Sequence, residues 1–276
     1  MPISVNTNSP AMKALTELNK SNRDLMTIQS RMNSGLKITS AKDNGAVFGM
    51  AQTLRADISN LAVVTDSLDH AIAVTDVAYS ASEALSDLML DMKEKALAAS
   101  DQSLDDRSRS ILNEDFIVLR NQISIVVGNA EFNGINLLNG TTNELAPITD
   151  GHGGQAVTIP GYDVRSGGAD NPITSTTVID PIASAREALA KIEESLEAQA
   201  SRMNSLGGRL RTMDTIRTLA VKTSDILTNN LGSMVDADLG KESARLQAAQ
   251  TKQQLQAQAL SIANQLPTFA TQLLNN

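Results

Sequence analysis

Apolar side chains recur at steps of three or four residues along most of this 276-residue chain, and this spacing predicts long amphipathic helices. The longest pattern runs from residue 45 to about residue 99, and its mean step of about 3.5 residues is typical of a left-handed coiled-coil seam. A helix of this length would be about 80 Å long. A second long pattern runs from 182 to 231, so we expect these two helices to pack against each other in antiparallel orientation.

Shorter helices are predicted at both ends of the chain and after the first long helix. Residues 11–34 form one amphipathic pattern, and another follows the polar segment 101–106 and stops at a Gly-Asn pair. A C-terminal helix begins after Asp238 and continues for about six or seven turns. Its apolar stripe is thin, so we expect its stability to come from partner helices. The N-terminal and C-terminal helices are natural partners for each other.

The segment between the two halves has a different composition. Residues 131–140 contain two Asn-Gly pairs, which predict a small hairpin. Residues 141–181 hold most of the chain's Pro together with many Gly and Thr, and they include β-prone pieces at 156–159 and 176–179. The predicted fold is therefore mainly α, with long antiparallel coiled-coil helices forming a rod and a small β-hairpin and loop module between the two halves.

Composition narrows the functional classes. Aromatic residues make up only 2% of the chain and Trp is absent, which favours a thin core spread along helices over a compact globule. The absence of Cys excludes a disulfide, a zinc-thiolate site and a thiol nucleophile. A net charge of −8 argues against nucleic acid as a partner, because phosphate binding needs clustered Lys and Arg.

No secretory signal pattern opens the chain, and no window approaches the roughly 18 consecutive apolar residues of a membrane span. We therefore expect no membrane insertion, and we expect any export to use a route that does not cleave a signal peptide.

Residues able to carry catalysis are few and scattered. His70 and His152 are the only histidines, and no spacing of Asp and Glu around them resembles a metal site. The glycine cluster at 151–154 lacks the Lys-Thr that follows a phosphate-binding loop. No catalytic residue, cofactor site or metal site is predicted, and the chain is not expected to be an enzyme.

Both ends of the chain carry motifs that resemble those of bacterial flagellin, the subunit of the flagellar filament. The N-terminal motif comprises Ile3, 6–8, Ala11, Ala14, Leu18, 31–35, 37–38, 40–41 and 43–46. The C-terminal motif comprises 236–238, Glu242, Leu246, Gln250, Gln253, 257–259, 263–265 and Pro267, and an internal Phe-Asn-Gly stands at 132–134. The resemblance spans roughly 1–140 and 182–276. It departs from the family at Met32-Asn33, where Leu-Ser is usual, at Asn44-Gly45, and at the final Asn275-Asn276.

The resemblance implies a short flagellin that lacks the large exposed domains of longer members. Residues 1–43 with 235–276 would form an inner core domain, and 44–234 an outer core domain with a surface connection at about 130–181. It implies self-assembly into a helical filament for swimming motility and export through the flagellar type III pathway. The implied partners are copies of itself, other flagellins, the filament cap, hook-associated proteins, and the export chaperone and apparatus.

Individual residues follow from the same resemblance and from the helical pattern. The expected subunit-assembly residues are Leu18, Leu25, Ile28, Leu246, Leu255, Leu260, Ile262 and Leu266. O-linked glycosylation is expected on the connecting loop at Ser175, Thr176 and Thr177. Asp91 stands where flagellins that stimulate the vertebrate innate receptor carry an arginine, which predicts weak stimulation.

Other readings remain open. A hook-filament junction protein would share both terminal motifs. A coiled-coil signalling module would share the long seams, but it would need a transmembrane segment or linker.

Overall fold

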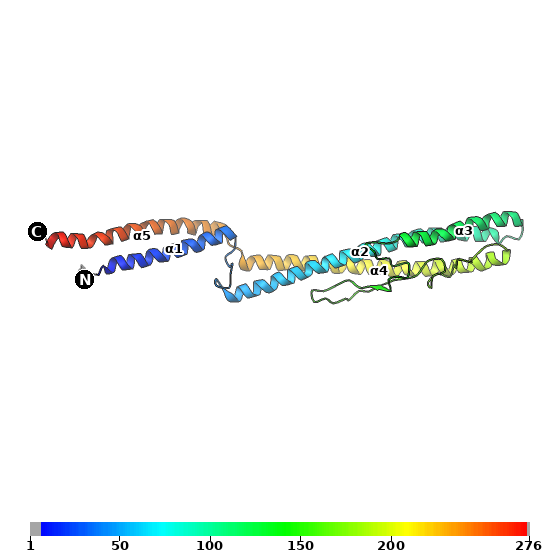
Figure 1. Cartoon of the computed structure of the whole chain (residues 1–276), viewed down its shortest axis with the longest axis horizontal. Helices are drawn as coiled ribbons and strands as arrows, with labels where there is room; N and C mark the ends of the chain where they lie inside the picture. Colours follow the sequence, from blue (N-terminus) through cyan, green and yellow to red (C-terminus); the bar gives the residue numbers. More distant parts are fainter. Residues whose placement is uncertain (1–6, 275–276) are drawn as a thin grey trace. The chain divides into compact units, whose positions relative to one another are not determined.

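The computed structural model describes residues 7–274, with side chains through Gln265, and its regular structure is almost entirely helical (Figure 1). The elements in chain order are α1 (Ser9–Ser34), α2 (Gly45–Ala99), α3 (Asp106–Asn129), β1 (Glu144–Leu145), β2 (Ile159–Pro160), α4 (Ile182–Val235) and α5 (Leu239–Leu274). The chain divides into two compact units, the terminal unit (residues 1–56 and 226–276) and the central unit (residues 57–225). The unit boundaries fall inside α2 and α4, whereas the predicted domain boundaries fall near helix ends.

α1 begins and ends at local signals in its sequence. The Asn8 side chain accepts a hydrogen bond from the backbone N–H of Ala11 at 3.1 Å, which satisfies one free donor of the first turn. Gly35 ends the helix with a φ of 69°, a left-handed conformation that glycine adopts without steric cost. In the terminal unit α1 lies beside α5 (Figure 1), which confirms the predicted pairing of the two ends.

The segments that join α1 to α2 and α4 to α5 bond to each other. The Lys37 N–H donates to the Val235 carbonyl at 2.7 Å, and the Ala237 N–H donates to the Gly35 carbonyl at 2.8 Å. These bonds form a short antiparallel bridge. They fix the level at which α1 ends and α5 begins.

In the central unit α2 and α4 run antiparallel, as predicted. Three contacts show this direction, because each later residue of α2 meets an earlier residue of α4. Asp69 forms an ion pair with Arg217, the Gln199 side chain donates to the Ser82 carbonyl at 3.2 Å, and Lys93 forms an ion pair with Glu193 at 2.9 Å.

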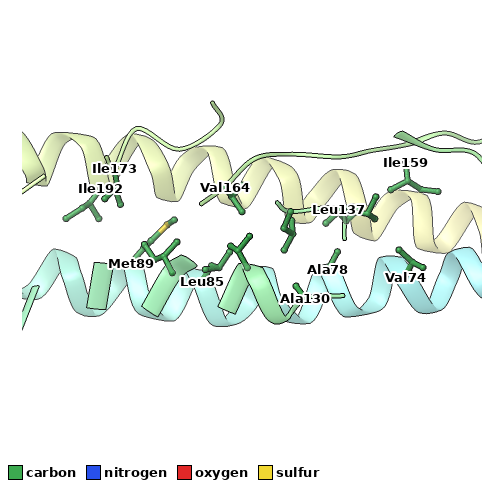
Figure 2. Packing of buried hydrophobic residues seen from close by; sticks show 14 of the residues in the cluster. Val74, Ala78, Leu85, Met89, Ala130, Leu137, Ile159, Val164, Ile173 and Ile192 are labelled. Carbon is green, nitrogen blue, oxygen red and sulfur yellow. The ribbon is translucent and has the colours of Figure 1, made fainter. Parts of the chain in front are cut away.

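The core of the central unit is aliphatic. Its fully buried side chains come from α2, α3, α4 and the connection after α3 (Figure 2), and they include Leu85, Met89, Phe116, Leu137, Ile173 and Ile192. Phe116 is the only Phe in this core, and leucine, isoleucine, valine, methionine and alanine fill the rest. The core is thin because each helix contributes one stripe to it.

The turn between α2 and α3 is closed by a buried arginine. Arg109 donates to the carbonyls of Ala99 at 2.9 Å, Asp101 at 3.0 Å and Leu104 at 3.2 Å. These bonds satisfy the last carbonyl of α2 and two carbonyls of the turn that follows it.

The predicted hairpin at 131–140 is a single tight turn. Phe132 and Ile135 form an antiparallel bridge around Asn133 and Gly134, whose φ angles are 50° and 82°. Positive φ at both central residues is what a type I′ turn requires, and Asn-Gly supplies it. The strands come later, where β1 pairs antiparallel with β2 to form the small two-stranded hairpin between the helical halves.

The strand predicted at 176–179 does not form. The Ile179 N–H donates to Asn113 Oδ1 of α3 at 2.9 Å, and Arg120 of α3 donates to the Thr177 carbonyl at 2.7 Å. Because helix side chains satisfy these backbone groups, the segment needs no strand partner. β-propensity alone does not reveal such contacts.

Candidate self-association surfaces

The faces of α1 and α5 that meet each other follow a heptad spacing. The partly or fully buried positions that keep this spacing are Ala11, Ala14, Leu18, Ser21, Leu25, Ile28 and Met32 on α1, and Glu242, Leu246, Ala249, Gln253, Gln256, Leu260 and Ala263 on α5. Fewer than half of them carry a large apolar side chain. The seam therefore buries little apolar area, and the pair alone is weakly stabilised.

Polar groups occupy the rest of this seam. The Gln253 side chain donates to Asn22 Oδ1 at 2.7 Å, and the Asn8 side chain donates to the Ala263 carbonyl at 2.8 Å. Buried oxygens of Ser21, Glu242 and Gln256 have no hydrogen-bond partner among the described residues. Leaving such a group unpaired costs about 1–3 kcal/mol. Contacts within one chain thus leave this helix pair incomplete.

The opposite faces of the same helices are apolar and exposed. Leu255 and Ile262 of α5 are 60% and 63% exposed, and Met12 and Met26 of α1 are 65% and 68% exposed. No Asp, Glu, Lys or Arg occurs from residue 253 to residue 274. A solvent-facing helix surface normally carries charges. The absence of charged side chains over this length is typical of a surface that another protein covers.

The central unit carries a second exposed stripe. Ile111, Val118 and Ile125 recur every seven residues on the outer face of α3 and are 56%, 56% and 62% exposed. Leu90 and Leu97 of α2 are exposed with the same spacing. Apolar spacing of three or four residues does not by itself separate this stripe from the inward-facing residues of α3. A search for two heptad series in one helix would have separated it from the buried series of Phe116 and Ile123.

Charge is distributed unequally between the units. The terminal unit holds ten Lys and Arg against six Asp and Glu, which gives +4, whereas the central unit holds thirteen against twenty-five, which gives −12. Contacts between central units of different copies must therefore overcome repulsion, which salt weakens.

The cavity of about 580 Å³ in the terminal unit is an open groove lined by Met50, Thr53, Leu54, Asn230, Ser233 and Met234. It contains no titratable side chain. The groove cannot supply a general acid or base and is better suited to hold an apolar side chain.

The structure separates the predicted assembly residues into two sets. Five are half-buried in the seam, namely Leu18, Leu25, Ile28, Leu246 and Leu260. Leu255 and Ile262 lie on the exposed face, and Leu266 lies outside the residues whose side chains are described. Leu260 is half-buried against α1, whereas Ile262 is exposed. Leu260 and Ile262 are about 200° apart around the helix, so only one of them can face outward.

The predicted surface residues also divide. Ser175 and Thr176 are exposed, but Thr177 is 6% exposed and its hydroxyl accepts a hydrogen bond from the Thr174 N–H at 3.0 Å. Thr177 is therefore not accessible for glycosylation in this fold. Asp91 is exposed on α2.

Among residues 7–274 no group of three or more His, Cys, Asp and Glu is placed to hold a metal ion. Within the same residues no helix is long and apolar enough to cross a membrane.

Comparisons with known proteins agree on one family. The bacterial flagellin N-terminal helical region matches residues 5–143, and the bacterial flagellin C-terminal helical region matches residues 189–274. Flagellin FljM of Caulobacter vibrioides is 43% identical over 262 residues, which cover 95% of each chain. A flagellin of Brucella melitensis is 33% identical over 270 residues, also covering 95% of each chain.

A solved structure described as a flagellar hook-associated protein from Vibrio parahaemolyticus is similar in fold. The superposition has a TM-score of 0.59 at 15% sequence identity and covers 70% of this chain and 100% of that one. At this identity the likeness concerns the fold alone.

The fold and its exposed helix faces define a mainly helical protein with uncovered apolar surfaces. The chain belongs to the bacterial flagellin family. It is a structural subunit of the extracellular flagellar filament, and the interpretation as a coiled-coil signalling module is wrong.

Proposed function

We propose that copies of this chain polymerise through the outer faces of α1 and α5, so that residues 1–43 and 235–276 form the inner wall of the filament and 44–234 lie outside it. The observation that carries the proposal is that residues 253–274 contain no charged side chain while Leu255 and Ile262, within this stretch, are exposed. Full burial of each side chain between copies stabilises the filament by roughly 1.5–3 kcal/mol. An uncharged face of one copy is a suitable partner for that of another, because neither loses the solvation of a charge.

The stripe of Ile111, Val118 and Ile125 supports a second contact, between the central units of neighbouring copies. The −12 charge of this unit opposes close approach. Apolar burial must outweigh that repulsion, so added salt should favour elongation.

Seeded elongation of the purified chain tests the proposal. Short flagellar fragments are mixed with the purified chain, and filament length is followed by electron microscopy. A filament subunit lengthens the fragments without other proteins. A hook-filament junction protein would stay monomeric, and that result would contradict the proposal.

The other partners follow from the same surfaces. Before assembly, the exposed apolar face of α5 needs a cover, which an export chaperone of the flagellar type III pathway supplies. Inside the filament the chain meets other flagellins, and at the two ends it meets the cap and the hook-associated proteins. Unassembled chain should therefore co-purify with a chaperone, and deletion of residues 253–276 should abolish that association.

Ser175 and Thr176 are the sites at which we place O-linked glycosylation, since both lie exposed on the connection between β2 and α4. A bulky sugar there avoids the helix faces used for assembly. The intact mass of chains from native filaments tests this placement, and a mass equal to the bare chain would exclude it.

A further inference from the structure

The two faces of α5 are almost equally apolar. Leu246 and Leu260 face α1, whereas Leu255 and Ile262 face outward with Ala248 on the same heptad series. Burial of apolar area therefore does not decide which face of α5 meets α1. Some other contact must make that choice.

We propose that the hydrogen bond between Asn22 and Gln253 makes the choice and keeps the Leu255–Ile262 face free for the next copy. The Gln253 Nε2 donates to Asn22 Oδ1 at 2.7 Å, and both residues are half-buried in the seam. If α5 turned by half a rotation, Leu255 and Ile262 would pack on α1 and Asn22 would lose this partner. The inference rests on the proposed function, because it concerns the surface by which copies polymerise.

The remaining contacts between the two helices do not select a face. The backbone bonds of Lys37 with Val235 and of Ala237 with Gly35 precede Leu239, where α5 begins, and neither involves a side chain on either face of α5. Asn8 bonds to the backbone carbonyl of Ala263, not to a side chain. The amide pair joins a side chain of α1 directly to a side chain of α5.

A polar pair between two helices is a known means of fixing how the helices pair, at some cost in stability. Two buried oxygens without a hydrogen-bond partner lie near this pair, since Ser21 is adjacent to Asn22 and Gln256 is three residues after Gln253. The observed face thus carries a polar cost that a seam chosen only for stability would avoid.

Because the chain lacks Cys, disulfide formation between introduced cysteines reports the face directly. Leu25 lies one turn after Asn22 on α1, and Ala249 lies one turn before Gln253 on α5. Both are in the seam. Ala248 is adjacent to Ala249 but belongs to the exposed face. Leu25→Cys with Ala249→Cys reports the observed face, and Leu25→Cys with Ala248→Cys reports the alternative face.

The pairs are compared in filaments and in unpolymerised chain by mild oxidation and non-reducing gels. With Asn22 intact, the 25/249 pair should close within one chain and the 25/248 pair should not. Asn22→Ala should lower the ratio of the two at least several-fold and shorten or abolish filaments. Asn19→Ala, the same change at an exposed position of α1, should alter neither.

The combined exchange Asn22→Gln and Gln253→Asn keeps an amide pair and should restore the ratio and elongation. An unchanged ratio in Asn22→Ala, an equal effect of Asn19→Ala, or no rescue by the exchange would overturn the face-selection role. Failure of the Asn22-bearing chain to elongate seeds would instead contradict the proposed function.

Discussion

Ile123 and Ile125 stand two residues apart on α3, and the first is completely buried while the second is 62% exposed. Two residues advance about 200° around a helix, so one side chain enters the core of the central unit and the other lies on the outer stripe. The helix therefore carries one face for folding and another that remains available for association.

This difference gives a matched pair of substitutions. Ile123→Ala should lower the free energy of unfolding by about 2–5 kcal/mol, because it removes buried methyl groups and leaves a cavity. Ile125→Ala should change it by no more than about 0.5 kcal/mol. Chemical denaturation of the purified chains measures both. Seeded elongation should be slower for Ile125→Ala, and unchanged elongation would exclude the α3 stripe from the filament contacts.

Leu255→Asp should stop filament growth without unfolding the chain. It would place an unpaired carboxylate in the contact between copies at a cost of several kcal/mol per subunit, whereas in the single chain the position is exposed. Circular dichroism of the variant should match the parent, and seeded elongation should be lost. The adjacent exposed Gln254→Asp is a control for the added charge and should be milder.

Leu260→Asp should behave differently from Leu255→Asp, because Leu260 lies in the seam with α1. Pairing of the two terminal helices should weaken in that variant. Normal filaments from Leu255→Asp would show that the outer face of α5 does not mediate assembly.

Trypsin should cut the unpolymerised chain first in the terminal helices. The seam of α1 and α5 buries little apolar area, so this helix pair should open more easily than the central unit, and Arg31 and Lys252 should be cleaved before sites in 57–225. Mass spectrometry of a time course identifies the early fragments. Early cleavage inside 57–225, with Arg31 and Lys252 intact, is the contrary result, and polymerised chain should resist cleavage at both ends.

Acid should loosen the start of α3. Hydrogen bonds from the Ser108 side chain and backbone to the Asp105 carboxylate lower the pKa of Asp105 below its ordinary value of 3.8. A lowered pKa stabilises the fold above the unfolded value, and this contribution is lost as the pH falls through the folded pKa. Asp105→Asn keeps a capping oxygen but does not titrate. Its melting temperature should therefore fall less than the parent's between about pH 6 and about pH 3. An equal fall would show that Asp105 does not contribute to the acid sensitivity.

Asp91→Arg should increase stimulation of the vertebrate innate receptor for flagellin, if the receptor contacts this position. Asp91 is exposed on α2, so the change needs no repacking, and guanidinium supplies donors that a carboxylate lacks. A reporter-cell assay compares the variant with the parent. A parent already as potent as a strong flagellin would contradict the proposal, and Asp87→Arg, also exposed on α2, tests whether added positive charge alone suffices.

The sequence by itself determined where the helices lie and how they pair, although α5 spans 36 residues and is longer than the predicted six or seven turns. Periodicity placed the long helices, Gly35 ended α1, and the matched motifs at the two ends named the family, because each signal depends on neighbouring residues only. The Asn-Gly pairs of residues 131–140 predicted a small hairpin, and the structure has a single tight turn at Asn133-Gly134.

The tertiary structure decided which face of each helix is used and how the connection is held. Leu260 and Ile262 have the same chemistry but opposite surroundings, and the helical period does not state which of two similar stripes meets the partner. Asn113 and Arg120 bind the backbone of residues 177–179 from another element, and this contact replaces the predicted strand. Such choices depend on groups far apart in the chain, so only the packed molecule fixes them.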